Sequence, residues 1–281
     1  MGICAYDIPT FNQLSAEKTI CSSEPQNTIS STQVERTSKF DFSDIPFSLK
    51  ELFTSNPTIP LPKIEKEIRD RERNCIFAKK SISKAFKHIS KEGINKKLSL
   101  MQFKRALYEL GINPKILEDP DDPMWLFLFS FQENSLFDMR KIIASFILIS
   151  DSELKKKIKF LYLLYDENEN RVLEQNEIRS MLSDLAEVSV ECLPLLVSNV
   201  ESSEELSKYM VFMRIEKERL IEEASKTLLG NLTEVGNVEL IGILQNSNDW
   251  FKIFRSEGLR ETILEKYKLP ENPQYLEQFL T

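Results

Sequence analysis

The chain has 281 residues, of which 41% are hydrophobic and only seven are glycine, and its formal net charge is −7. This length and composition are sufficient for one large or two ordinary domains with a buried core, and they favour helices over a turn-rich sheet protein. The negative charge argues against a nucleic-acid partner, because no basic excess is present to neutralise phosphates.

Residues 1–62 are predicted to form an extended, partly disordered tail or anchoring arm. Residues 1–40 are rich in Ser, Thr, Gln and Asn, and such a segment buries too little apolar surface to fold alone. The start of the chain resembles an acylation signal, with Gly2 for myristate and Cys4 for palmitate, although Tyr6 stands where Ser or Thr is usual. A membrane tether through Gly2 and Cys4 and a free terminus are both left open.

Helical periodicity begins near residue 63 and defines a first segment, 63–150, which contains two loops of the same layout. In the loop 91–102, Leu98 stands at position eight of a twelve-residue frame. In the loop 130–141, Phe137 holds the same position. Neither loop has an acidic residue at position twelve, so neither is expected to bind a metal.

A third loop, 166–177, belongs to a second segment, 151–254, and is rich in oxygen-bearing side chains. They fall at positions one, three, five, nine and twelve, which are Asp166, Asn168, Asn170, Glu174 and Glu177. Position seven, Val172, would contribute its backbone carbonyl. This is the order in which a loop presents ligands to a hard cation, so the sequence predicts one calcium site here.

Position six of the third loop departs from the usual pattern. The chain turns there with a positive φ, which normally requires glycine, but this chain has Arg171. The left-handed conformation costs an ordinary residue roughly 1–2 kcal/mol, and two of the ligands are neutral amides. We therefore expect a calcium affinity in or below the range of sensor proteins, rather than that of tight buffers.

A long charged helix is expected from about residue 204 to 229, followed by a fourth loop at 231–242. In this frame Gly236 is at position six, Val238 at position eight and Gly242 at position twelve, so no calcium is expected. The loops should pair first with second and third with fourth, because a single unit leaves its apolar helix faces uncovered.

The last segment, 255–281, is predicted to be an additional C-terminal helix and tail. The apolar helix after the fourth loop either fills the groove that a target helix would occupy or anchors a partner itself. Both alternatives are left open by the sequence.

The whole layout resembles the EF-hand superfamily, in particular the neuronal calcium sensor and calcineurin B-like proteins. The resemblance is carried by the loop 166–177, its flanking residues Leu161, Tyr165 and Ile178, the ligand-poor first loop and the Met-Gly start. The three loops begin at residues 91, 130 and 166, a spacing typical of internal duplication. The resemblance implies an all-α fold of two pairs of EF-hand helix-loop-helix units. It also implies calcium-dependent exposure of an apolar groove that binds a target helix.

Two functions are therefore expected. The first is a calcium-binding regulatory protein that binds a protein target through an apolar groove. The alternative is a constitutive structural or adaptor subunit of a larger assembly, because cytoskeletal and axonemal EF-hand proteins are also similar and use the fold mainly as a shaped wedge.

An enzyme is not expected, because the single histidine, His88, leaves no nucleophile–base pair and no glycine-rich phosphate loop is present. Four scattered cysteines predict a cytoplasmic location, with attachment to a membrane, the cytoskeleton or a cilium as alternatives. No apolar run approaches the ~20 residues that cross a bilayer.

Overall fold

The described part of the chain is mostly helical, as predicted, with strands of only two or three residues. The computed structural model describes residues 61–120, 122–198, 203–230, 232–246 and 250–266. The tail that carries Gly2 and Cys4 and the predicted tail after residue 266 lie outside the described residues. All described residues belong to one compact unit, Phe47–Thr281, so the segments 63–150 and 151–254 pack against each other.

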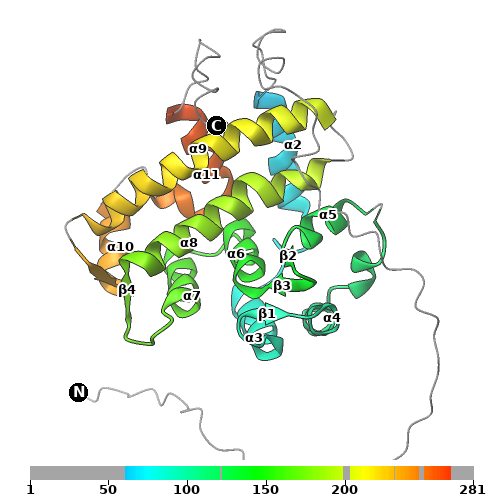
Figure 1. Cartoon of the computed structure of the whole chain (residues 1–281), viewed down its shortest axis with the longest axis horizontal. Helices are drawn as coiled ribbons and strands as arrows, with labels where there is room; N and C mark the ends of the chain where they lie inside the picture. Colours follow the sequence, from blue (N-terminus) through cyan, green and yellow to red (C-terminus); the bar gives the residue numbers. More distant parts are fainter. Residues whose placement is uncertain (1–60, 121, 199–202, 231, 247–249, 267–281) are drawn as a thin grey trace, which may run out of the picture. The chain divides into compact units, whose positions relative to one another are not determined.

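The helices and strands follow one another along the chain as Figure 1 shows. The α-helices are α2 (Leu61–Asn74), α3 (Ile82–Glu92), α4 (Leu100–Glu109), α5 (Pro123–Phe129), α6 (Met139–Ile149), α7 (Leu154–Tyr165), α8 (Gln175–Glu187), α9 (Ser203–Leu229), α10 (Asn237–Asn246) and α11 (Ser256–Lys266). The strands are β1 (Lys97–Leu98), β2 (Gln132–Glu133), β3 (Leu136–Asp138), β4 (Val172–Glu174) and β5 (Glu234–Gly236). Shorter helical turns are η2 (Pro114–Leu117), η3 (Val188–Cys192), η4 (Leu193–Val197) and η5 (Trp250–Phe254). None of the helices in these ranges is both long and apolar enough to cross a bilayer.

Small antiparallel strand pairs join the loops. β1 pairs with β3, which places Leu98 opposite Phe137, and β2 pairs with the other edge of β3. β4 pairs with β5, with Leu173 opposite Val235. All four of these side chains are fully buried. Each strand pair therefore holds two apolar side chains in the core between the helices that flank its loops.

The fourth loop starts its strand three residues earlier than predicted. The frame 231–242 placed Val238 at position eight, where it would lie opposite Leu173. In the structure Val235 occupies that place, and Val238 is 85% exposed. The predicted frame was therefore wrong, because strand pairing sets the register of the loop.

The glycine with the left-handed backbone differs from the one that the sequence frame requires. The frame 231–242 predicts a positive φ at Gly236, whereas Gly230, directly after α9, has the positive φ, 55°. A glycine in this conformation commonly ends a helix. Counting from β5 puts Glu239 at position twelve, and its carboxylate accepts the Gly236 N–H at 3.4 Å. Residues 230–233 alone separate α9 from β5, so this loop is too short for a full ring of ligands.

A buried ion cluster ties α2 to α11. Arg260 of α11 is fully buried, and its guanidinium donates to the carboxylates of Glu65 and Glu72 on α2, at 3.0 Å and 2.7 Å. Tyr209 of α9 donates its hydroxyl to Glu65 at 2.7 Å. Burial acts to raise the pKa of Glu65, but the charge and hydrogen bonds of Arg260 outweigh it and hold that pKa below its usual value. Apolar periodicity predicted the last helix, but it carried no sign of this charge cluster.

The chain covers the apolar faces of its own helices. After α8, the turn η4, with Leu193 and Val197 buried, packs against α2 and α5. After α10, the turn η5, with Ile253 and Phe254 buried, packs against α7, α10 and α11. The helix α11 itself packs against η3 and α9. The C-terminal helix therefore packs on its own chain, and the two roles predicted for it, filling a target groove or anchoring a partner, stay predictions.

Lys157 of α7 is buried between two helix ends. Its ammonium group donates to the backbone carbonyl of Leu148 in α6 at 3.1 Å and to that of Phe254 in η5 at 3.2 Å. Burial lowers the pKa of Lys157 to about 8. The carbonyls at the C-terminal ends of the two helices favour the charged ammonium group. The loss of its hydration on burial is the larger effect, so the pKa is lowered.

The stability of the protein is expected to depend on pH through Lys157. The unfolded chain holds this proton more tightly than the folded protein, so deprotonation relieves a penalty of the folded state. The free energy of unfolding of the wild type should therefore rise, relative to Lys157→Met, between about pH 8 and pH 10.5. Urea unfolding of both proteins across this range measures the difference, and a constant difference would contradict the prediction.

The Lys157→Met comparison also cancels an opposite effect of two buried thiols. Burial raises the pKa of Cys75 to about 11 and that of Cys192 to about 12. These groups hold their protons more tightly in the folded protein, so they reduce stability as the pH rises above the ordinary thiol pKa. Both variants carry them, and only the contribution of Lys157 remains in the difference.

Candidate metal centre

The third loop turns back on its first residue. Helix α7 ends at Tyr165, and the carboxylate of Asp166 accepts the backbone N–H groups of Asn170 at 3.1 Å and Arg171 at 3.0 Å. These two bonds draw residues 166–171 into a ring around one acidic side chain. A short aspartate side chain at the end of a helix readily makes such bonds to nearby N–H groups.

Position six has a left-handed backbone in all three of the first loops. The φ angles are 60° at Lys96, 64° at Ser135 and 67° at Arg171. The predicted positive φ at Arg171 is thus confirmed, and its side chain is exposed. A non-glycine residue in this conformation is strained by roughly 1–2 kcal/mol, so the three loops adopt this turn at a cost that the surrounding packing must offset.

The other predicted ligands of the third loop lie in one hydrogen-bonded network. The Glu174 carboxylate accepts from the side-chain amides of Asn168 at 3.0 Å and Asn170 at 3.3 Å. The two oxygens of Glu177 accept the N–H groups of Glu167 at 2.8 Å and Glu174 at 3.0 Å. The bond to Glu174 belongs to a capping box that starts α8. The five side chains therefore meet over the same turn, and Val172 follows in β4.

The chemistry of this set suits a hard cation. Its donors are carboxylate and amide oxygens together with the backbone carbonyl of Val172, the ligand types that calcium prefers. Over the described ranges, no three side chains of His, Cys, Asp or Glu are grouped as a metal site. In the third loop, the acids Asp166 and Glu177 bond to backbone N–H groups, and Glu174 bonds to two amides. A metal here would have to be bound by acids and asparagines together.

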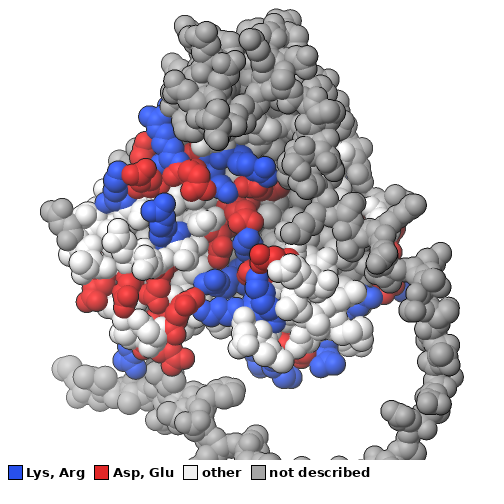
Figure 2. All heavy atoms as spheres, viewed as in Figure 1, with Lys and Arg blue, Asp and Glu red and all other residues white. Residues whose placement is uncertain are grey.

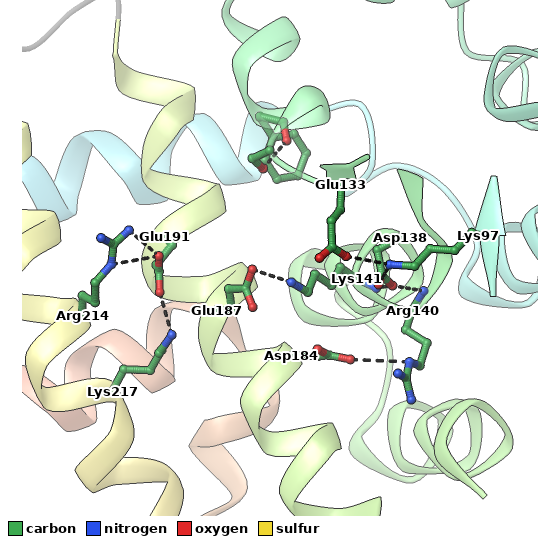
Figure 3. Close-up of polar contacts among 12 residues, drawn as sticks. Lys97, Glu133, Asp138, Arg140, Lys141, Asp184, Glu187, Glu191, Arg214 and Lys217 are labelled. Carbon is green, nitrogen blue, oxygen red and sulfur yellow. Dashed lines mark hydrogen bonds and ion pairs between the residues drawn. The ribbon is translucent and has the colours of Figure 1, made fainter. Parts of the chain in front are cut away.

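Ion pairs occupy the two degenerate loops, 91–102 and 130–141. Lys141, at position twelve of the second loop, donates to Glu187 of α8 at 2.5 Å. Lys97 of the first loop donates to Asp138 of the second at 2.8 Å (Figure 3). The hydrogen bond that Lys97 donates to Asp138 contributes most to raising the pKa of Lys97. In the second loop, a cation thus stands at position twelve, where a metal-binding loop has a carboxylate, and the ion pair of Lys97 joins the first loop to the second.

The two helices that flank the third loop are joined by side chains that the loop pattern missed. Tyr165 of α7 donates its hydroxyl to Asp184 of α8 at 2.7 Å. Burial raises the pKa of Tyr165 well above its usual value and also raises that of Asp184. Arg140 of α6 lies over the Tyr165 ring, 5.6 Å from its centroid. Figure 3 shows the ion pair of Arg140 with Asp184, in which the guanidinium is 3.8 Å from the carboxylate. Only the tertiary contact of three helices brings these groups together.

No model of a known protein family matches this chain, and no curated protein sequence matches it. Its function must therefore be inferred from the site itself.

Arg171→Gly is expected to be more stable than Arg171→Ala by roughly 1 kcal/mol. Both variants lose the arginine charge, but only glycine relieves the strain of the left-handed turn at this position. Urea unfolding measures the two free energies. Equal values would show that the turn at position 171 is not strained.

Proposed function

We propose that this chain is a calcium-binding regulatory protein of the EF-hand type, with one competent loop, 166–177, and a protein target. The observation that carries the proposal is the closed turn of this loop. The Asp166 carboxylate accepts the backbone N–H groups of Asn170 and Arg171. Glu177, in the first turn of α8, accepts the N–H of Glu167, the residue next to Asp166. In the calcium-bound protein, Asp166, Asn168, Asn170, Glu174 and Glu177, with the Val172 carbonyl, would hold the ion.

The position of these residues provides a means of regulation. Asp166 caps the C-terminal end of α7, and Glu177 lies in the first turn of α8. A bound calcium ion supplies two positive charges that favour a common centre for these two carboxylates. Because the carboxylates are attached to different helices, their approach changes the angle between α7 and α8, and with it the apolar surface available to a target.

A second function, a constitutive adaptor, is favoured by a different observation. The turns η4 and η5 and the helix α11 cover apolar faces of the other helices. An adaptor of this kind would bind a cytoplasmic assembly through its outer surface, whether or not calcium is present. The two degenerate loops are compatible with this function, because an adaptor needs the shape of the fold and not its metal.

Calorimetry with calcium tests the first proposal. We expect a saturable heat for one site, with a dissociation constant between about 1 µM and 1 mM, and a parallel change in a fluorescent probe of exposed apolar surface. No heat and no probe response below millimolar calcium would exclude the regulatory function. Capture of partners from cell extracts with and without a chelator then separates the two candidates. Binding that requires calcium supports the regulator, and binding that ignores the chelator supports the adaptor.

A further inference from the structure

Glu167, the second residue of the third loop, connects that loop to the other half of the molecule. It is not one of the predicted ligands. Its carboxylate accepts from the ammonium group of Lys96 at 2.6 Å and from the guanidinium of Arg140 at 2.8 Å. The partners are 71 and 27 positions away in the sequence, so the contact is tertiary.

Both cations come from the degenerate loops. Lys96 is position six of the loop 91–102, and Arg140 is position eleven of the loop 130–141. Arg140 is itself held by the ring of Tyr165, which directly precedes the third loop. Figure 2 shows acidic side chains gathered over the region of β4 and the loop before it, with basic side chains beside them towards α6 and β3.

The backbone of Glu167 contacts a predicted metal ligand. Its N–H donates to Glu177, the predicted ligand at position twelve. The same residue is therefore fixed through its side chain to the two degenerate loops and through its backbone to a predicted ligand. Residues that hold a loop in its binding shape reduce the ordering that a ligand must impose, and so raise its affinity.

We propose that the two degenerate loops position the third loop for its metal by holding Glu167 with Lys96 and Arg140. This inference rests on the proposed calcium function of the third loop. It gives the degenerate loops a role that needs no metal of their own: they order the start of the metal loop. Glu167 is a positioning residue and not a ligand.

The chain offers a matched control for the charge of Glu167. Glu169 is also a non-ligand carboxylate of the third loop and is exposed, and it forms no ion pair with any described residue. Glu167→Gln and Glu169→Gln remove the same charge from the same loop, but only the first turns the ion pairs with Lys96 and Arg140 into weaker hydrogen bonds to a neutral amide oxygen. We expect Glu167→Gln to weaken calcium binding about three- to tenfold more than Glu169→Gln in calorimetric titrations. Equal losses would mean that charge alone acts, and would overturn the proposal.

Hydrogen exchange without calcium provides a second readout that does not depend on metal binding. The amides of Asn170 and Arg171, which are bonded to Asp166, should exchange about three- to tenfold faster in Glu167→Gln and in Lys96→Met. They should exchange as in the wild type in Glu169→Gln and in Lys96→Arg, which keeps the cation. Unchanged exchange in Glu167→Gln would overturn the positioning role. If the wild type shows no calcium heat, the proposed function fails, and this exchange measurement still decides whether the degenerate loops order the third.

Discussion

Replacing Arg260 by methionine is expected to lower the free energy of unfolding by about 3–5 kcal/mol, the usual effect of breaking a buried ion pair. The guanidinium is fully buried and bonds to Glu65, to Glu72 and to the Ser189 carbonyl. Methionine fills a similar volume but leaves the buried Glu72 carboxylate without its cation, and it leaves Glu65 with only the partly exposed Arg69. At about 2–4 °C per kcal/mol for a protein of this size, the melting temperature should fall by roughly 6–20 °C.

The loss arises from unpaired charge, and a compensating variant tests this cause. Adding Glu65→Gln and Glu72→Gln to Arg260→Met removes both charges, and the glutamine at position 65 still accepts the Tyr209 hydroxyl. This triple variant should recover part of the lost stability. Arg255→Met is the matched control, because Arg255 is an exposed arginine just before α11, and it should change stability by less than about 0.5 kcal/mol. Equal losses for Arg260→Met and Arg255→Met in thermal unfolding would contradict the prediction.

Replacing Glu177 by glutamine is expected to weaken calcium binding at least about 100-fold, or roughly 2.7 kcal/mol. Position twelve normally binds calcium through both carboxylate oxygens, and an amide offers one oxygen without a charge. Without calcium, the effect should be small, because glutamine can still accept one of the two N–H bonds that Glu177 accepts. We expect a loss of about 1 kcal/mol in unfolding without calcium. Calorimetry and urea unfolding measure the two quantities.

Glu239→Gln is the matched control for this prediction. Glu239 has the corresponding place in the fourth loop and accepts the Gly236 N–H, as Glu177 accepts the Glu174 N–H. The fourth loop is too short to surround a cation, so the change should leave the calcium affinity unaltered. A titration in which Glu177→Gln binds calcium as the wild type does would show that the loop 166–177 is not the site.

The third loop was predictable because its contacts are local. Asp166 bonds to N–H groups four and five positions later, and Glu177 caps the helix on which it lies. The left-handed turn at Arg171 follows from the spacing of these groups. The fourth loop was not predictable in the same way, because both Gly230 and Gly236 offered a turn. Only the pairing of Val235 with Leu173 chose between them.

Long-range charge contacts were the part that the sequence did not reveal. The periodicity of α2 marked Glu65 and Glu72 as members of a charged helix, for which a solvated face is the usual expectation. Both are buried because α11 brings Arg260 to them from 195 and 188 positions away. The same holds for Glu167. In the sequence it is a non-ligand acid of an acidic loop, and only the fold brings Lys96 within hydrogen-bond distance of its carboxylate.

Sequence patterns alone predicted the mostly helical fold, the frames of the first three loops and the order of oxygen-bearing side chains in the third loop. These features depend on residues within about one turn of helix or one twelve-residue loop of each other. Tertiary contacts were needed to set the register of the fourth loop, to bury Arg260 and to bring Lys96 and Arg140 to Glu167. A charge is buried only where a polar or oppositely charged group pairs with it, and a strand takes its register only from the strand beside it. In both cases, packing brings the partner from a distant part of the chain.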